Sequence, residues 1–192
     1  LFSPDSIDRL LADIRARLPL VPDCEITLEA NPGTFERERF RAFRAAGVTR
    51  LSIGVQSFDD ASLQAIGRVH DAAQAHAAVQ EARSAFDTFN LDLMYALPGQ
   101  SLAMLESDLD VALSFAPTHL SVYHLTLEPN TWFATHPPKL PDDDLAASML
   151  ATTLGIEFDE NVHWDERKEL WKINNQIYKT ANFTQSAIAD KR

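Results

Sequence analysis

The sequence predicts an α/β fold, specifically a partial parallel (βα) barrel that lacks its first strands. Four short apolar runs recur roughly every 30 residues, with helical patterns between them, and such alternation is typical of βαβ units. A closed eight-stranded barrel needs about 250 residues. Four strands therefore predict an open sheet. The runs are Cys24–Glu29, Arg50–Val55, Phe89–Tyr95 and Leu120–Leu127.

The first predicted element is a helix that begins after Ser3. Ser3 is a suitable N-cap, and Pro4 fits the first helical turn. Apolar residues then recur at helical spacing from Ile7 to Ile14, and Pro19 ends the pattern. The first strand follows.

Three further helices are predicted before the third strand. Thr34 caps a helix that ends at Gly47, which suits a C′ position. After the second strand, residues 59–66 form a short helix, and Asp71 caps an Ala-rich helix that runs to about Phe86.

The pattern continues beyond the third strand. Ser101 caps a helix, and the fourth strand follows it. Prolines from Pro129 to Pro141 predict a loop, and residues 142–154 form the last helix of this series.

The composition changes near Gly155, which predicts two regions, 1–154 and 155–192. The first region contains one Lys and ten Arg, whereas the second contains four Lys and two Arg. The second region is a tail of unknown origin and is expected to be helical. Apolar residues lie on one side of a possible helix from Glu166 to Lys179.

The net charge of −11 argues against nucleic acid or an anionic membrane as a partner, because no basic field attracts phosphates. No apolar run approaches the roughly 20 residues that span a bilayer, so a cytoplasmic protein is expected. Cys24 is the only cysteine, so the chain cannot supply the thiolates of an iron–sulfur cluster. Because the sequence starts at Leu1, we expect it to be a piece of a longer chain.

Polar side chains at the strand ends are the candidate binding residues. In parallel α/β folds, ligands bind outside the carboxyl ends of the strands. Glu29, Gln56, Asp92 and Thr126 can accept hydrogen bonds from an ammonium group and ribose hydroxyls, and Arg68 can clamp a carboxylate. An amino-acid-bearing nucleoside presents all of these groups. The alternative is that the acidic residues are solvated or cap helices, and that Arg68 belongs to a surface ion pair.

No catalytic residue or metal site is predicted. The six histidines are scattered, and none forms a pair at ligand spacing on a helix. His124, on the fourth strand, is interpreted as a core or rim histidine; the alternative is that it faces the barrel interior. Cys24 is interpreted as a small buried residue.

Four segments together resemble the coproporphyrinogen dehydrogenase-like branch of radical S-adenosylmethionine (SAM) enzymes, over about residues 1–154. The Asn-Pro-Gly-Thr and Gln-Ser-Phe variants are more similar to the haem-chaperone (HemW) group than to the coproporphyrinogen III dehydrogenase (HemN) group. The segments are Leu28–Thr34, Leu51–Phe58 with Gly67–His70, Asp92–Gln100 and Ser121–Thr131.

The resemblance implies that Glu29, Gln56, Arg68 and Asp92, together with Thr126, match SAM-contacting positions. Family members hold a [4Fe–4S] cluster with a CxxxCxxC loop and use it to reduce SAM. This loop is absent here, as are the Gly-Gly-Thr-Pro motif and the His-Asn-x-x-Tyr-Trp segment associated with haem. The chain itself is therefore expected to be inactive.

Several functions remain open at this point. The first is a fragment of a HemW-like haem chaperone, with SAM and haem or porphyrin as partners. The alternatives are a HemN-like enzyme that oxidatively decarboxylates coproporphyrinogen III, a non-catalytic SAM- or haem-binding module, and a piece that folds poorly. An exposed sheet edge would also invite self-association.

Overall fold

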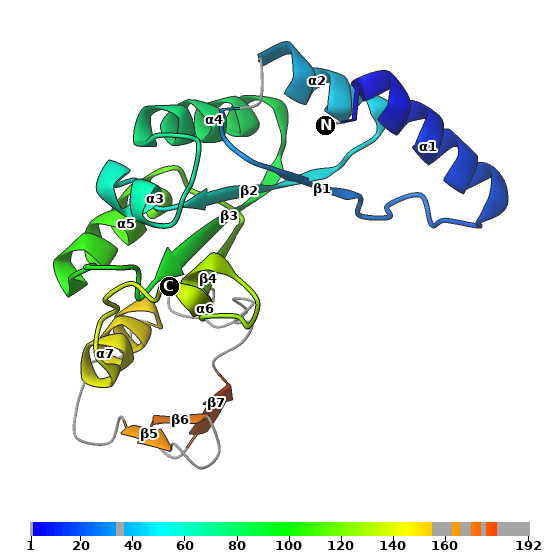
Figure 1. Cartoon of the computed structure of the whole chain (residues 1–192). Coiled ribbons are helices and arrows are strands. Elements are labelled where there is room, and N and C mark those ends of the chain that lie inside the picture. Colours follow the sequence, from blue (N-terminus) through cyan, green and yellow to red (C-terminus); the bar gives the residue numbers. More distant parts are fainter. Residues whose placement is uncertain (1, 34–36, 155–162, 166–169, 174–175, 180–192) are drawn as a thin grey trace.

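The computed structural model describes residues 2–33, 37–154, 163–165, 170–173 and 176–179. Its main feature is a four-stranded parallel sheet in which the strands follow chain order (Figure 1). The strands are β1 (Thr27–Ala30), β2 (Arg50–Gln56), β3 (Thr88–Tyr95) and β4 (His119–His124). This open sheet confirms the predicted α/β class and its parallel order.

Helices cover one side of the sheet (Figure 1). Within the described residues, α4, α5 and α7 contact the central strands, whereas α2 packs against α1 and α4. The helices are α1 (Pro4–Arg17), α2 (Arg37–Ala46), α3 (Asp60–Ala65), α4 (Ala72–Ala85), α5 (Leu102–Ser114), α6 (Trp132–Thr135) and α7 (Asp143–Thr153).

The two faces of the sheet differ because side chains alternate along each strand. The helix-covered face consists of fully buried aliphatic residues such as Leu51, Ile53 and Leu91. The opposite face carries polar residues at the intervening positions, including Ser52 and Asn90. The core therefore lies between the sheet and the helices, and the other face is available for polar contacts.

Caps set the helix starts where the sequence predicts them. The Ser3 side chain accepts a hydrogen bond from the Ser6 N–H, with Pro4 at the first helical position. Asp71 and Ser101 each form a capping box with the residue three positions on. The predicted Thr34 cap lies outside the described residues.

The main differences from the prediction concern β1, β4 and the proline-rich loop. β1 begins at Thr27 rather than Cys24, because pairing starts only where Ile26 and Thr49 exchange hydrogen bonds. β4 ends at His124, so Thr126 lies beyond the strand. The predicted proline-rich loop contains the single helical turn α6, which Thr131 caps.

The prediction of a helical tail is wrong for the residues that the structure describes there. Three antiparallel strands form a second sheet: β5 (His163–Asp165), β6 (Leu170–Ile173) and β7 (Gln176–Lys179). The apolar residues of this segment are largely β-branched or aromatic, and such residues favour strands. Periodicity alone misled the prediction, because so short a pattern fits both periods. The predicted boundary near Gly155 lies outside the described residues.

No helix in the described part of the chain is long and apolar enough to cross a membrane.

Candidate functional site

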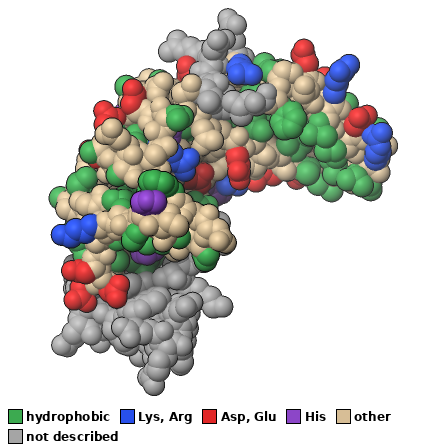
Figure 2. Space-filling view, in the orientation of Figure 1, with side chains coloured by type: hydrophobic (Ala, Val, Ile, Leu, Met, Phe, Trp, Pro, Cys, Tyr) green, Lys and Arg blue, Asp and Glu red, His purple; other side chains and the backbone are tan. Residues whose placement is uncertain are grey.

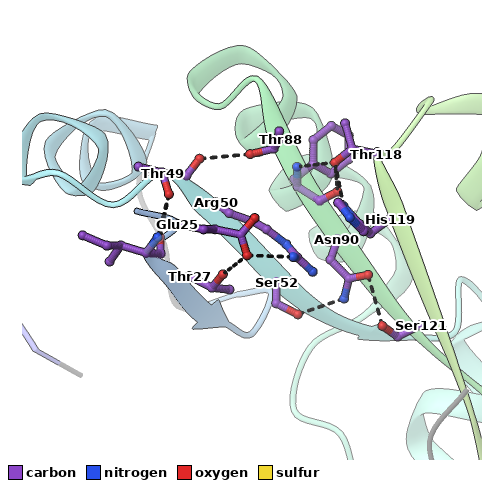
Figure 3. Close-up of polar contacts among 12 residues, drawn as sticks. Glu25, Thr27, Thr49, Arg50, Ser52, Thr88, Asn90, Thr118, His119 and Ser121 are labelled. Carbon is purple, nitrogen blue, oxygen red and sulfur yellow. Dashed lines mark hydrogen bonds and ion pairs between the residues drawn. The ribbon is translucent and has the colours of Figure 1, made fainter. Parts of the chain in front are cut away.

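The open face of the parallel sheet carries the candidate site. In the space-filling view, the molecule is hollowed below the sheet, and charged side chains lie along the rim of that hollow (Figure 2). The polar side chains that cross the open face from strand to strand are shown in Figure 3.

A row of hydrogen bonds joins β2, β3 and β4 across this face (Figure 3). The Ser121 hydroxyl donates to Asn90 Oδ1 at 3.1 Å, and Asn90 Nδ2 donates to Ser52 Oγ at 2.9 Å. Ser52 and Asn90 also bond to Asp92. Ser52 Oγ donates to one carboxylate oxygen of Asp92 at 3.0 Å, and Asn90 Nδ2 donates to the other at 2.8 Å. The Asp92 carboxylate therefore has a fixed orientation.

Two carboxylates lie close together on the open face. Burial raises the pKa of Asp92, and the negative charge of Glu29 raises it further, whereas hydrogen bonds from Ser52, Asn90 and Ser121 lower it. Glu29 is exposed in β1 and is paired in register with Ser52. Because two acidic groups share this region, it favours a ligand that brings a positive charge or several hydroxyl donors.

Gln56 ends β2 in an unusual backbone conformation. Its φ is 68°, and the N–H of Ser57 donates to the carbonyl of Val55 at 2.9 Å. A positive φ with such an i to i+2 hydrogen bond defines a strained γ-turn. Gln56 is only 8% exposed, so its carboxamide is held within the protein rather than in solvent.

Gly54 forms the floor between two carboxamides. A Cβ atom at this position would lie 2.8 Å from Asn31 Oδ1 and 3.1 Å from Gln56 Nε2. Only glycine therefore allows both carboxamides to approach the backbone of β2 here. The arrangement places Asn31, which follows β1, beside Gln56.

Arg68 lies in the loop between α3 and α4 and is exposed. The loop is tied to the end of β2, because His70 Nε2 donates to the Val55 carbonyl at 3.1 Å. Arg68 is thus two residues from His70, which bonds to the residue before Gln56. No ion pair of Arg68 occurs among the described residues, so the predicted alternative of a surface ion pair is not seen there.

Thr126 lies in the exposed loop after β4, on the same edge of the sheet as the end of β2. Its hydroxyl donates to Glu128 Oε1 at 2.8 Å. The structure therefore brings Glu29, Gln56 and Asp92 to one face, with Arg68 and Thr126 in loops at its carboxyl edge.

The amino-terminal edge of the same face is occupied by structural contacts (Figure 3). Arg50 Nη1 lies 3.0 Å from Glu25 Oε1, which also accepts from the Thr27 hydroxyl. The Thr88 hydroxyl donates to the Thr49 carbonyl just before β2, and the Thr118 hydroxyl donates to the Phe89 carbonyl in β3. These contacts hold neighbouring strands together at the amino-terminal edge, so the carboxyl edge is the candidate place for a ligand.

His124 does not face the open side of the sheet, so the alternative that it faces the barrel interior is wrong. Its ring packs against Tyr95 with a centroid distance of 5.0 Å, on the helix-covered face. Burial lowers the pKa of His124, and Asp143 opposes that shift. Among the described residues, no group of three or more His, Cys, Asp or Glu side chains could hold a metal ion.

Sequence reasoning missed Ser52, Asn90 and Ser121, which hold Asp92 in place, and Asn31. One signal was present: polar residues alternate with apolar residues along much of β2, β3 and β4. The rule that ligands bind at carboxyl strand ends does not select these residues, because most of this network lies within the strands.

This site lies on a fold that a family model also matches. The radical SAM superfamily model covers residues 2–112, and the chain belongs to this superfamily.

Within the superfamily, haem chaperones are similar to this chain. It is 52% identical to heme chaperone HemW of Haemophilus influenzae over 145 residues, which are 75% of this chain and 38% of that protein. The HemW protein of Escherichia coli is 51% identical over the same coverage. The chain therefore spans well under half the length of these curated relatives.

Solved structures agree on the fold. The coproporphyrinogen III oxidase HemN from Escherichia coli, described as a radical SAM enzyme, matches with a TM-score of 0.71 and 24% identity. The match covers 91% of this chain and 46% of that chain. The archaeal Elp3 of Methanocaldococcus infernus matches with a TM-score of 0.58 over 70% of this chain and 33% of that chain.

The two cofactors that the superfamily implies fit this chain unequally. An iron–sulfur cluster needs several thiolates, and this sequence has one cysteine, Cys24, which lies half-buried before β1. The residues of this chain therefore do not fit the cluster. SAM fits better, because the open face offers carboxylates, two carboxamides and a glycine floor.

Proposed function

We propose that this chain is the SAM-binding part of a haem chaperone similar to HemW. One observation carries the proposal: Gln56 and Asn31 meet over Gly54 on the open face that also holds Asp92 and Glu29. The 52% identity to a heme chaperone supports the haem-related role. A cytoplasmic location is part of the same proposal.

In this proposal, each group of SAM has a matching partner. Asp92 and Glu29 accept hydrogen bonds from ribose hydroxyls or from the ammonium group. Gln56 both donates and accepts, and the Arg68 guanidinium binds the carboxylate. Thr126 contributes a weaker contact at the carboxyl edge. The residues of this chain would bind SAM and orient it on the open face.

The role with haem concerns the whole protein. We infer that the longer protein binds haem, or a related porphyrin, and transfers it, because its relatives are heme chaperones. The alternative is oxidative decarboxylation of coproporphyrinogen, which the HemN fold match favours. Identity of 24% to that enzyme against 52% to the chaperone makes the chaperone the better-supported reading.

Calorimetric titration of SAM into the purified chain tests the binding site. We expect saturable heat, with affinity reduced about tenfold or more in Arg68→Ala and Gln56→Ala, because each removes a polar or charge-assisted contact. Arg83→Ala is the matched control: Arg83 is also exposed, but it lies in the last turn of α4, away from the loop that carries Arg68. No heat, or heat that neither site substitution changes, would remove the proposal.

Haem binding is a separate arm of this test. When haem is added to the chain, the absorbance band of haem should shift if the chain carries part of the haem site. A full-length relative provides the positive control. An unchanged spectrum with intact SAM binding would restrict this chain to the SAM-binding role.

Self-association through β1 is a further part of the proposal. Within the described residues, β1 pairs only with β2, so its other edge is open. We expect the elution volume in size-exclusion chromatography to decrease with concentration. Thr27→Lys places a charge in this edge strand and should reduce the effect; a monomer at all concentrations would contradict it.

A further inference from the structure

An aspartate on α5, Asp108, accepts two hydrogen bonds from the turn that follows Gln56. Asp108 is only 3% exposed, and both of its carboxylate oxygens are used. One accepts from the Ser57 hydroxyl at 2.7 Å, and the other accepts from the Phe58 N–H at 2.7 Å. These are short, charge-assisted bonds, and both donors belong to the two residues that follow Gln56.

A buried carboxylate at this place requires a reason. Burial raises the pKa of Asp108, and the nearby charge of Asp59 raises it too, whereas the bonds from Ser57 and Phe58 lower it. A residue that served only to fill space on α5 would be apolar, as its neighbour Leu105 is. The carboxylate is present at Asp108 because the turn needs an acceptor.

The turn is under strain and is held from two sides. Gln56 adopts a φ of 68°, which a residue other than glycine keeps only when its surroundings impose it. α5 holds the turn through Asp108, and the loop before α4 holds it through His70 on the Val55 carbonyl. Ser57 Oγ also accepts from the Asp59 N–H at 3.0 Å, which links the turn to the start of α3.

The position of the Gln56 side chain depends on this turn. The γ-turn ends regular pairing of β2, where the register with β3 shifts between Ile53 and Gln56. In this conformation, Gln56 Nε2 lies 3.1 Å from the place where a Cβ of residue 54 would stand. A relaxed backbone at residue 56 would turn the carboxamide away from Gly54 and Asn31.

We propose that Asp108 is a positioning residue: through Ser57 and Phe58 it holds the strained turn that orients the Gln56 carboxamide for the ligand. The inference rests on the proposed function, because it assumes that SAM binds the open face. The Asp108 carboxylate bonds to Ser57 and Phe58 in the turn after β2, so its proposed effect on the ligand is indirect.

The test compares SAM affinity among variants of the full chain. We expect Asp108→Asn to lower the affinity about tenfold, because an amide cannot accept both hydrogen bonds. In a Gln56→Ala background the same substitution should cause no further loss, since its effect passes through Gln56. Asp110→Asn is the matched control, because Asp110 lies on the same helix and is exposed.

A second measurement reports the hydrogen bonds between Asp108 and the turn in the absence of any ligand. The Phe58 amide, bonded to a carboxylate at 2.7 Å, should resonate downfield and exchange slowly with solvent. Asp108→Asn should move this signal upfield and speed its exchange. If Asp108→Asn fails to fold, Ser57→Ala removes one of the two bonds and should give a smaller change in the same direction.

The outcomes separate the two proposals. Wild-type chain that binds SAM, together with Asp108→Asn that binds it equally well, overturns the role of Asp108 and leaves the proposed function intact. Wild-type chain that does not bind SAM overturns the proposed function, and the role of Asp108 falls with it. If Asp108→Asn lowers SAM affinity in the wild-type chain but has no effect on it in the Gln56→Ala background, both proposals are supported.

Discussion

The two faces of the parallel sheet are built on different principles. On the helix-covered face, residues such as Leu51, Leu91 and Leu93 are fully buried and interact through close packing. On the open face, Ser52, Asn90 and their neighbours are joined by directional hydrogen bonds. Packing tolerates many apolar residues of suitable volume, whereas a hydrogen-bond network fixes both residue type and orientation. The covered face should therefore control stability, and the open face should control binding.

The largest expected effect is on the covered face. Leu91→Ala should reduce the free energy of unfolding by about 2–5 kcal/mol, because it leaves a cavity among fully buried side chains. Chemical denaturation measures this loss. SAM affinity of the protein that remains folded should stay within about threefold. A large loss of affinity at intact folding would mean that the two faces are not separable.

Gly54→Ala should act mainly on binding. The new Cβ would meet Asn31 Oδ1 at 2.8 Å, so Asn31 and Gln56 must move. We expect at least about a tenfold loss of SAM affinity, with a destabilisation of about 1–3 kcal/mol from the overpacking. Adding Asn31→Ala removes the clash and should recover part of the stability without recovering the affinity. Equal SAM binding by Gly54→Ala would show that the two carboxamides do not form the site.

Asp92→Asn tests the open face through pH. The folded-state pKa of Asp92 is raised above its ordinary value of 3.8, so the folded protein holds this proton more tightly than the unfolded chain. The resulting stabilisation is complete below pH 3.8 and is lost as the pH rises through the folded-state pKa. Relative to wild type, Asp92→Asn should therefore become more stable between pH 4 and pH 7. Thermal unfolding of both proteins at these two pH values measures the difference, and parallel curves would contradict it.

Thr126→Ala should have the smallest effect. Thr126 is exposed beyond the end of β4, and its hydroxyl bonds only to nearby Glu128 among the described residues. The proposal gives it a contact at the edge, so SAM affinity should fall by about threefold or less. Calorimetry beside Gln56→Ala ranks the two residues. A greater loss of SAM affinity in Thr126→Ala than in Gln56→Ala would contradict the proposal that the residue at the strand end matters more than the loop residue.

The sequence predicted the covered face well because local chemistry determines it. Apolar runs, the Ser3 and Asp71 caps and the turn glycine Gly47 each act over a few residues. The tail was the exception. Between Glu166 and Lys179 the apolar residues fit a helix and a strand alike, and the strands β6 and β7 depend on pairing with each other.

The open face was predictable only in part. The rule that ligands bind at carboxyl strand ends selected Glu29, Gln56 and Asp92, which the structure brings to one face. Asp108 could not be selected in this way, because it lies 51 residues from Ser57 and looks like any polar residue of a helix. Its role depends on a contact that forms only when α5 packs beside the end of β2.

The most direct test of this account maps SAM onto the backbone. Amide chemical shifts of the chain are recorded as SAM is added. If the open face binds SAM, the signals that move belong to its carboxyl edge: residues 29–31, 54–58, 92–96 and 124–126. Signals of the middle of α4 should stay in place. Absence of shifts, or shifts centred on the helices that cover the other face, would contradict the claim that the open face is a binding site.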